Sequence, residues 1–211
     1  MTTYTREKWV QRLKSRSDLS GQVVHFTRSA TIDEKPQSGL EMLQRILRER
    51  VIKGSGAEGY IRGSHKAVCF QDAPLYYLCQ NLEAEYDLVN GKPRDKCRYE
   101  PFGLMFMNHL VYKAGGRPVI YDDPDLALKY LSESEWWRIV SYKLSDTKSF
   151  IDWTHEREWR LKGDFSFNLE CVTVLVPNWK AFHQFMESSR NANDGMCDKV
   201  KAVIPLASIL V

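Results

Sequence analysis

A charged stretch between two tryptophans constrains this chain more than any other feature of its sequence. Residues 152–161 read DWTHEREWRL. As a β-strand this stretch would place Glu156, Glu158 and Arg160 on one face of a sheet, with apolar residues on the other. Because a partly buried carboxylate must be paired or hydrogen-bonded, the pattern favours a strand that carries chemistry. The alternative is a solvated edge strand with surface ion pairs.

Length and composition are those of a globular protein. The chain has 211 residues, enough for one domain with a full core and few for two, so we expect a single domain over residues 1–211. The hydrophobic fraction of 43% and the charged fraction of 27% argue against disorder. A formal net charge of +3 permits an anionic ligand without requiring nucleic acid.

The cysteines and the apolar runs indicate the compartment. The 5 cysteines form no C-x-x-C pair and have no histidine at zinc-finger spacing, which favours a reduced protein without a metal site. No apolar run approaches the roughly 20 residues of a membrane span, and the first residues lack the apolar segment of a signal peptide. We therefore expect a cytoplasmic protein with no membrane association.

Alternating helical and strand patterns predict an α+β domain around a central, bent sheet. Ser38 and Glu41 have the spacing of a capping box at the start of one helix. We expect helices over residues 6–14, 38–51, 72–79, 122–131, 133–144 and 178–187. We expect strands over residues 22–27, 67–70, 102–106, 117–121, 171–176 and 200–204, in addition to the charged stretch.

Three short patches resemble a known superfamily in their order along the chain. They are the sequences HFT at residues 25–27, LQRIL at residues 43–47 and REWRL at residues 157–161. This order is similar to that of the ADP-ribosyltransferase superfamily, and most of all to its DarT-type toxins and related PARP-like folds. In those proteins an H-[FYIV]-T strand precedes an L-x-x-I-L helix, and a late strand R-x-x-E-[FW]-x-[VL] supplies the catalytic glutamate. Arg157, directly before Glu158, departs from that pattern.

The resemblance implies an ADP-ribosyltransferase-like fold, with a bent central mixed sheet and flanking helices, and NAD as the substrate. It implies that Glu158 is catalytic and that His25 and Thr27 hold NAD. The spacing of Glu156 and Glu158 resembles the E-x-E of arginine-modifying members, in which the first carboxylate activates the acceptor. Cleavage of the nicotinamide bond develops positive charge on the ribose, which a carboxylate at Glu158 would stabilise.

Further residues are candidates for binding the cofactor. Tyr60 or Phe70 would stack on the nicotinamide ring. Arg62, Arg117 or Arg160 would bind the pyrophosphate through a bidentate guanidinium.

Two functions remain open at this point. The first is an NAD-dependent ADP-ribosyltransferase, acting as a toxin or phage-defence effector on single-stranded DNA, RNA or protein, with an antitoxin as a possible partner. The second is a non-catalytic protein of a defence or toxin–antitoxin system that binds a nucleotide or nucleic acid. A catalyst needs its carboxylate in a cleft that admits the ribose, whereas a binding protein needs only a basic groove lined with aromatic residues.

Overall fold

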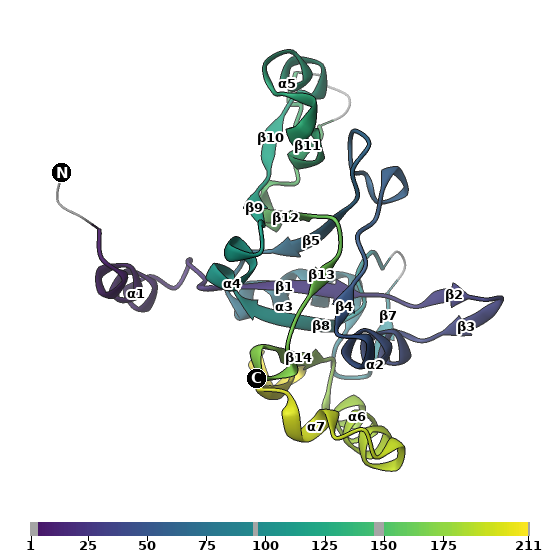
Figure 1. Cartoon of the computed structure of the whole chain (residues 1–211). Helices are drawn as coiled ribbons and strands as arrows, with labels where there is room; N and C mark the ends of the chain where they lie inside the picture. The colour runs from purple at the N-terminus through teal and green to yellow at the C-terminus, as the bar shows by residue number, and fades with distance from the viewer. Residues whose placement is uncertain (1–3, 95–96, 146–149, 211) are drawn as a thin grey trace.

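A seven-stranded mixed sheet forms the centre of the protein (Figure 1). The computed structural model describes residues 4–94, 97–145 and 150–210. The strand order is β15-β14-β8-β1-β5-β12-β9, in which β14 and β15 are parallel and the other neighbours are antiparallel. These strands are β1 (Gln22–Thr27), β5 (Ala67–Gln71), β8 (Phe102–Met107), β9 (Arg117–Pro118), β12 (Glu158–Lys162), β14 (Thr173–Val176) and β15 (Ala202–Pro205).

The helices flank this sheet. Figure 1 shows α6 and α7 at one end of the molecule, α5 at the other, and α1 projecting from the body. The α-helices are α1 (Arg6–Ser15), α2 (Gly39–Glu49), α3 (Leu75–Glu85), α4 (Asn108–Lys113), α5 (Pro124–Tyr130), α6 (Trp179–Ala192) and α7 (Met196–Lys199). Short 3-10 helices are η1 (Ala57–Gly59), η2 (Glu133–Arg138), η3 (Thr154–Glu156), η4 (Leu169–Cys171) and η5 (Leu206–Ile209).

Small two-stranded sheets complete the structure. They pair β2 (Ala30–Ile32) with β3 (Lys35–Gln37), β4 (Val51–Ile52) with β13 (Phe165–Ser166), β6 (Tyr86–Asp87) with β7 (Lys92–Pro93), and β10 (Ile120–Asp122) with β11 (Ile139–Ser141). The β2–β3 hairpin projects from the side opposite α1 (Figure 1).

Both faces of the central sheet are covered by apolar side chains. In β1, Val23 joins a core that includes Leu43 of α2 and Phe185 of α6, whereas the next residue, Val24, joins a core that includes Leu78 of α3. This division follows from the alternation of side chains along a strand. All four residues of β14 are buried, as expected for a strand covered on both faces.

Several predicted elements are confirmed. The predicted strand over residues 22–27 coincides with β1, and Ser38 and Glu41 form the expected reciprocal capping box at the start of α2. The expected class, an α+β protein with a central mixed sheet and flanking helices, is also confirmed. Among the described residues, no helix is long and apolar enough to cross a membrane.

Other predicted boundaries are wrong for identifiable reasons. The helix predicted over residues 133–144 is instead the short turn η2 followed by β11, because Ile139 and Val140 are buried in a parallel pairing with β10. The strand predicted over residues 117–121 is divided between two sheets: β9 pairs with β12, and β10 pairs with β11.

The charged stretch is also not one continuous strand. Asp152 accepts hydrogen bonds from the backbone N–H and the hydroxyl of Thr154, which starts the turn η3. Arg157 then adopts a left-handed conformation with φ of 46°. The strand therefore begins only at Glu158.

Phe106 lies at the centre of an aromatic cluster in the larger core. Its side chain is 1% exposed, and its ring lies 5.1 Å from both Phe165 and Phe167 and 6.3 Å from Phe70, centroid to centroid. We predict that Phe106→Ala lowers the free energy of unfolding by about 3–5 kcal/mol, because it leaves a cavity among these rings. Urea unfolding followed by circular dichroism measures this change. The exposed Phe150→Ala should cost less than about 0.5 kcal/mol, and equal losses would contradict the packing described.

Candidate active site

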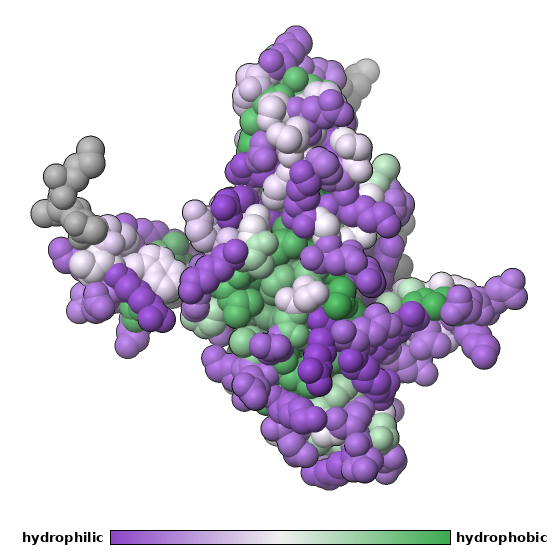
Figure 2. All heavy atoms as spheres, in the orientation of Figure 1, coloured by the Kyte–Doolittle hydropathy of each residue, from purple (hydrophilic) through white to green (hydrophobic). Residues whose placement is uncertain are grey.

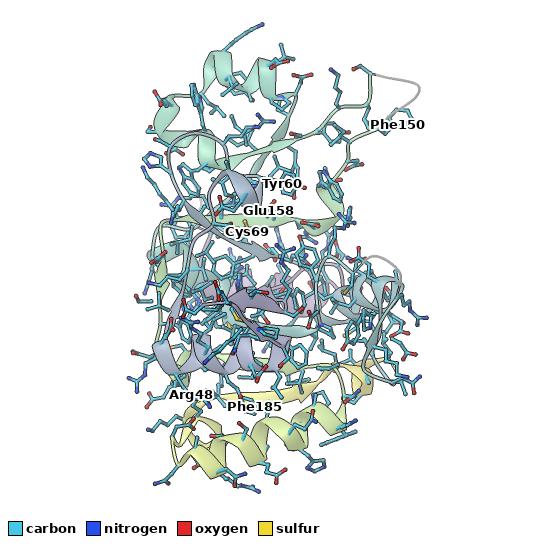
Figure 3. The ribbon with its side chains drawn as sticks, turned by 90° about the vertical axis from the view of Figure 1, so that its right-hand side faces the viewer. Arg48, Tyr60, Cys69, Phe150, Glu158 and Phe185 are labelled. Carbon is cyan, nitrogen blue, oxygen red and sulfur yellow. The ribbon has the colours of Figure 1, made fainter. Side chains whose placement is uncertain are left out.

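A cavity of about 520 Å³ opens beside strands β5 and β12. This volume lies within the range of about 300–1,000 Å³ typical of small-molecule sites. Figure 3 shows Tyr60, Cys69 and Glu158 close together here, while Arg48 and Phe185 lie at the other end of the molecule. The polar and aromatic residues that line the cavity are Tyr60, Arg62, Cys69, Arg98, Tyr99, Ser141, Trp153, Glu156, Glu158 and Arg160.

The register of β12 against β5 sets which side chains reach this cavity. Arg160 pairs with Cys69 in the sheet, and both residues line the cavity. Between Glu158 and Arg160, the side chain of Trp159 packs against the larger core on the opposite face. The alternation that the sequence predicted for the last part of the charged stretch therefore holds from Glu158 onward.

Glu158 and Arg160 form a buried ion pair. Their side chains are 9% and 4% exposed, and Nε of Arg160 donates to Oε1 of Glu158 at 2.8 Å, with a second contact from Nη2 to Oε2 at 3.5 Å. Nη1 of Arg160 donates to the carbonyl oxygens of Trp137 at 2.8 Å and Ile139 at 3.1 Å. The guanidinium of Arg160 therefore contacts the carboxylate of Glu158 as well as two backbone carbonyl oxygens. These contacts fix the position of Glu158, the catalytic candidate.

Glu156 is the second carboxylate in the cavity. It is 9% exposed, and the hydroxyl of Tyr99 lies 3.2 and 3.3 Å from its two oxygens, so that it can donate to either. Burial raises the pKa of Glu156, and the nearby charge of Glu158 raises it further, while Tyr99 and Arg98 oppose the shift. A carboxyl with a raised pKa is suited to accepting and releasing a proton closer to neutral pH.

The two carboxylates reach the same cavity by a route that strand alternation did not predict. Glu156 lies in the turn η3, and the left-handed Arg157 changes the direction of the chain before β12 begins. Nη1 of Arg157 donates to the carbonyl oxygen of Asp18, outside the cavity. The turn therefore keeps Glu156 and Glu158 together and directs the intervening guanidinium elsewhere.

Two tyrosines from other parts of the chain hydrogen-bond to these glutamates, Tyr99 to the carboxylate of Glu156 and Tyr121 to the backbone of Glu158. The backbone N–H of Glu158 donates to the hydroxyl of Tyr121 at 2.7 Å, and burial raises the pKa of Tyr121 to about 12. Burial also raises the pKa of Tyr99, as do the charges of Glu156 and Glu158. Both hydroxyls stay protonated at neutral pH, and neither tyrosine was singled out from the sequence.

The mouth of the cavity combines aromatic rings with cations. Tyr60 is 88% exposed and has a left-handed backbone with φ of 61°. Nη2 of Arg62 donates to the hydroxyl of Ser141 at 3.1 Å, and the guanidinium of Arg98 lies 4.3 Å from the ring centroid of Trp153. Such an entrance fits a ligand with planar rings and negative charge.

The structure does not bring His25 to this cavity. By strand alternation its side chain lies on the same face of the sheet as Val23, where its ring is 6.0 Å from that of Phe70, centroid to centroid. Its Nδ1 lies 2.9 Å from the carbonyl oxygen of Cys69, which requires the hydrogen to be on Nδ1. Burial lowers the pKa of His25, more than this hydrogen bond raises it, which favours the neutral imidazole.

The remaining sequence candidates lie outside the cavity. Thr27 is buried and its hydroxyl donates to the carbonyl oxygen of Phe102 at 3.1 Å. Phe70 is 1% exposed, within the larger core. Arg117 lies over the ring of Tyr112, 4.0 Å from its centroid. Of the cofactor-binding candidates, the cavity therefore gathers Tyr60, Arg62 and Arg160.

A larger hollow of about 600 Å³ lies on another part of the surface. It is lined by Leu110 of α4, by Ala114 directly after that helix and by residues 165–168, and Figure 2 shows hydrophobic side chains gathered over this region. No pair of buried carboxylates is found among the described residues that line this hollow. The cavity of about 520 Å³ is therefore the stronger candidate for an active site. In the part of the chain that the structure describes, no three His, Cys, Asp or Glu residues are grouped so as to hold a metal ion.

Comparison with known proteins yields no relative. No protein-family model matches the chain, no curated protein is significantly similar to it, and no solved structure matches its fold. The function must therefore be inferred from the residues of the site itself.

We predict that the buried ion pair behaves as one unit. Arg160→Met should lower the free energy of unfolding by about 3–5 kcal/mol, because it leaves the carboxylate of Glu158 buried without its partner. The double variant Glu158→Gln/Arg160→Met should recover most of this loss, since no unpaired charge remains. Urea unfolding of both variants and of Glu158→Gln measures the coupling. Losses that simply add would contradict the pairing.

We predict a pH-dependent effect of Glu156→Gln. The folded protein holds a proton on Glu156 more tightly than the unfolded chain does, so ionisation of Glu156 destabilises the fold as the pH rises above its ordinary pKa of 4.5. The glutamine has no such cost. The stability of the variant relative to the natural protein should therefore increase between about pH 4 and pH 7. Urea unfolding across this range tests it, and a constant or opposite difference would contradict the raised pKa.

Proposed function

We propose that this chain is an NAD-dependent ADP-ribosyltransferase that acts as a toxin or phage-defence effector. The observation that carries the proposal is the pair of buried carboxylates, Glu156 and Glu158, in one cavity of a size suited to a small molecule. The aromatic and cationic mouth adds support, because NAD has two planar bases and a pyrophosphate. The order of the sequence patches that resemble ADP-ribosyltransferases agrees with this choice.

In the proposed reaction Glu158 stabilises the transition state. Cleavage of the bond between the ribose and nicotinamide develops positive charge on the sugar, so a fixed carboxylate interacts more strongly with the transition state than with NAD. The guanidinium of Arg160 uses only part of the hydrogen-bonding capacity of Glu158, which leaves lone pairs for a ribose hydroxyl. Glu156, with its raised pKa, takes the proton of the acceptor.

The contacts change the roles that the sequence suggested for the residues that bind NAD. All of the nitrogens of Arg160 contact Glu158 or backbone carbonyls, so binding of the pyrophosphate falls to Arg62, with Arg98 beside it. Tyr60 is the exposed ring at the entrance and stacks on a base of NAD. His25 acts indirectly, by holding the backbone of Cys69 next to the cavity.

A second function is favoured by two specific observations. The ion pair between Glu158 and Arg160 is one that a purely structural site would also contain, and His25 lies away from the cavity. Both fit a non-catalytic protein of a defence or toxin–antitoxin system that binds a nucleotide or nucleic acid. For either function an antitoxin is a candidate partner.

We predict that the purified protein releases nicotinamide from NAD, alone or with single-stranded DNA, RNA or cell lysate. Glu158→Gln should reduce release by about 100-fold or more, because it removes the charge that stabilises the transition state. Chromatographic measurement of nicotinamide tests this. Glu187→Gln, an exposed substitution on α6, serves as the matched control and should release nicotinamide at the natural rate. Absence of release with every acceptor, together with no binding of NAD in calorimetry, would favour the non-catalytic function.

A further inference from the structure

Helix α1 lies apart from the rest of the fold. It projects from the body of the protein (Figure 1), and all of its side chains are exposed or only partly buried. Trp9, Val10 and Leu13 form an apolar stripe along it, of which Trp9 and Leu13 lie against Gly21. None of the three core clusters of the described residues includes a side chain of α1. A helix of 10 residues is marginal in water without tertiary packing, so the stripe is suited to a partner that covers it.

The segment that contains α1 carries the excess charge of the chain. Residues 4–18 include five Lys or Arg and two Asp or Glu, a net charge of +3, which equals the formal net charge of the whole chain. The remaining residues are therefore neutral overall. Within the described part of the chain, Arg16 is the one cation of this segment in an ion pair, with Asp18. Helix α1 is thus a basic helix with an apolar stripe, and its charge favours contact with an acidic surface.

Helix α5 has the opposite charge and an apolar face of its own. Leu126 and Tyr130, four residues apart on one face, are 54% and 60% exposed. Residues 122–135, which include α5 and the start of η2, contain five Asp or Glu and one Lys or Arg, a net charge of −4. Asp125 and Glu133 are exposed, and neither forms an ion pair in the part of the chain that the structure describes. This surface therefore complements α1 both in charge and in its exposed apolar side chains.

We propose that α1 of one copy of this chain docks on α5 of a second copy, and that the exchange is reciprocal, so that two copies form a symmetric dimer. Within one chain the two helices lie at different ends of the molecule (Figure 1), so α1 does not cover its own α5. A nucleic acid is a poorer occupant, because phosphates would neutralise the cations of α1 and leave its apolar stripe uncovered. The proposal does not depend on the proposed function.

The small size of each contact favours the reciprocal arrangement. A helix with the 10 residues of α1 is about 15 Å long, so one contact between α1 and α5 is small against the roughly 800 Å² per partner of a stable interface. Two identical contacts double the buried area and close the assembly, whereas a single head-to-tail contact would extend into a chain of copies. We therefore expect a dimer that dissociates on dilution.

Sedimentation velocity of the full chain over a range of concentrations tests this proposal. At low salt we expect a species with twice the mass of one chain, and we expect its dissociation constant to rise with salt, because exposed charges are screened. Arg6→Glu/Lys14→Glu should raise the dissociation constant about tenfold or more, since like charges then face each other in both contacts. Lys180→Glu/Lys201→Glu reverses two exposed cations outside the contact, and this matched control should associate as the natural protein does.

An exchange of charges between the two helices identifies the surfaces. Asp125→Lys/Glu133→Lys should weaken the dimer as the α1 variant does, and a chain with all four substitutions should recover a dissociation constant within about threefold of the natural value. Circular dichroism should show the natural fold in each variant, because every substituted side chain is exposed.

Three results would overturn the proposal. The first is a monomer at every concentration at low salt. The second is a dimer that the reversed charges leave unchanged, or that the four combined substitutions fail to restore. The third is a monomer whose binding to a fluorescent oligonucleotide is lost in the α1 variant, which would make α1 a surface for nucleic acid. None of these measurements uses NAD, so failure of the transferase function leaves the result unaffected.

Discussion

The buried ion pair between Glu158 and Arg160 is the interaction on which the site depends. Removing two charges from water is costly, and their attraction offsets that cost only when the geometry is good and the remaining donors are satisfied. Here the guanidinium meets both conditions, since it contacts the carboxylate and also the carbonyl oxygens of Trp137 and Ile139. The pair therefore joins β12 to the segment that contains η2 and β11. The same contacts that fold this edge of the protein also place the carboxylate of Glu158 in the cavity.

A break in the strand gives the site its second carboxylate. An uninterrupted strand would have placed Glu156 two residues before Glu158 at strand spacing, about 7 Å along the chain. The turn η3 and the left-handed Arg157 replace this arrangement, and Tyr99 holds Glu156 from a different part of the chain. Burial and the nearby charge of Glu158 raise the pKa of Glu156 in this position, which suits Glu156 to proton transfer.

The sequence predicted the parts of the structure that depend on local patterns. The run of Val, Phe and Thr in residues 22–27 and the capping box at Ser38 each define an element without help from distant residues. The helix predicted for residues 133–144 is wrong because a tertiary contact, the pairing of β11 with β10, outweighs the helical pattern of the sequence. In the site, alternation was enough to find Glu158 and Arg160. Tyr99 and Tyr121 could not be found, because only the fold brings them to the carboxylate of Glu156 and the backbone of Glu158, 57 and 37 residues away.

His25 of β1 contributes to the site although its side chain does not line the cavity. Strands β1 and β5 pair at Val24 and Gln71, and a continued antiparallel register would next place Phe26 opposite Cys69. The pairing stops there instead, and Nδ1 of His25 donates a hydrogen bond to the carbonyl oxygen of Cys69. Because a buried carbonyl without a partner is costly, this hydrogen bond stabilises the separation of the strands. The side chain of Cys69 lines the cavity, so His25 supports the floor of the site through the backbone of β5.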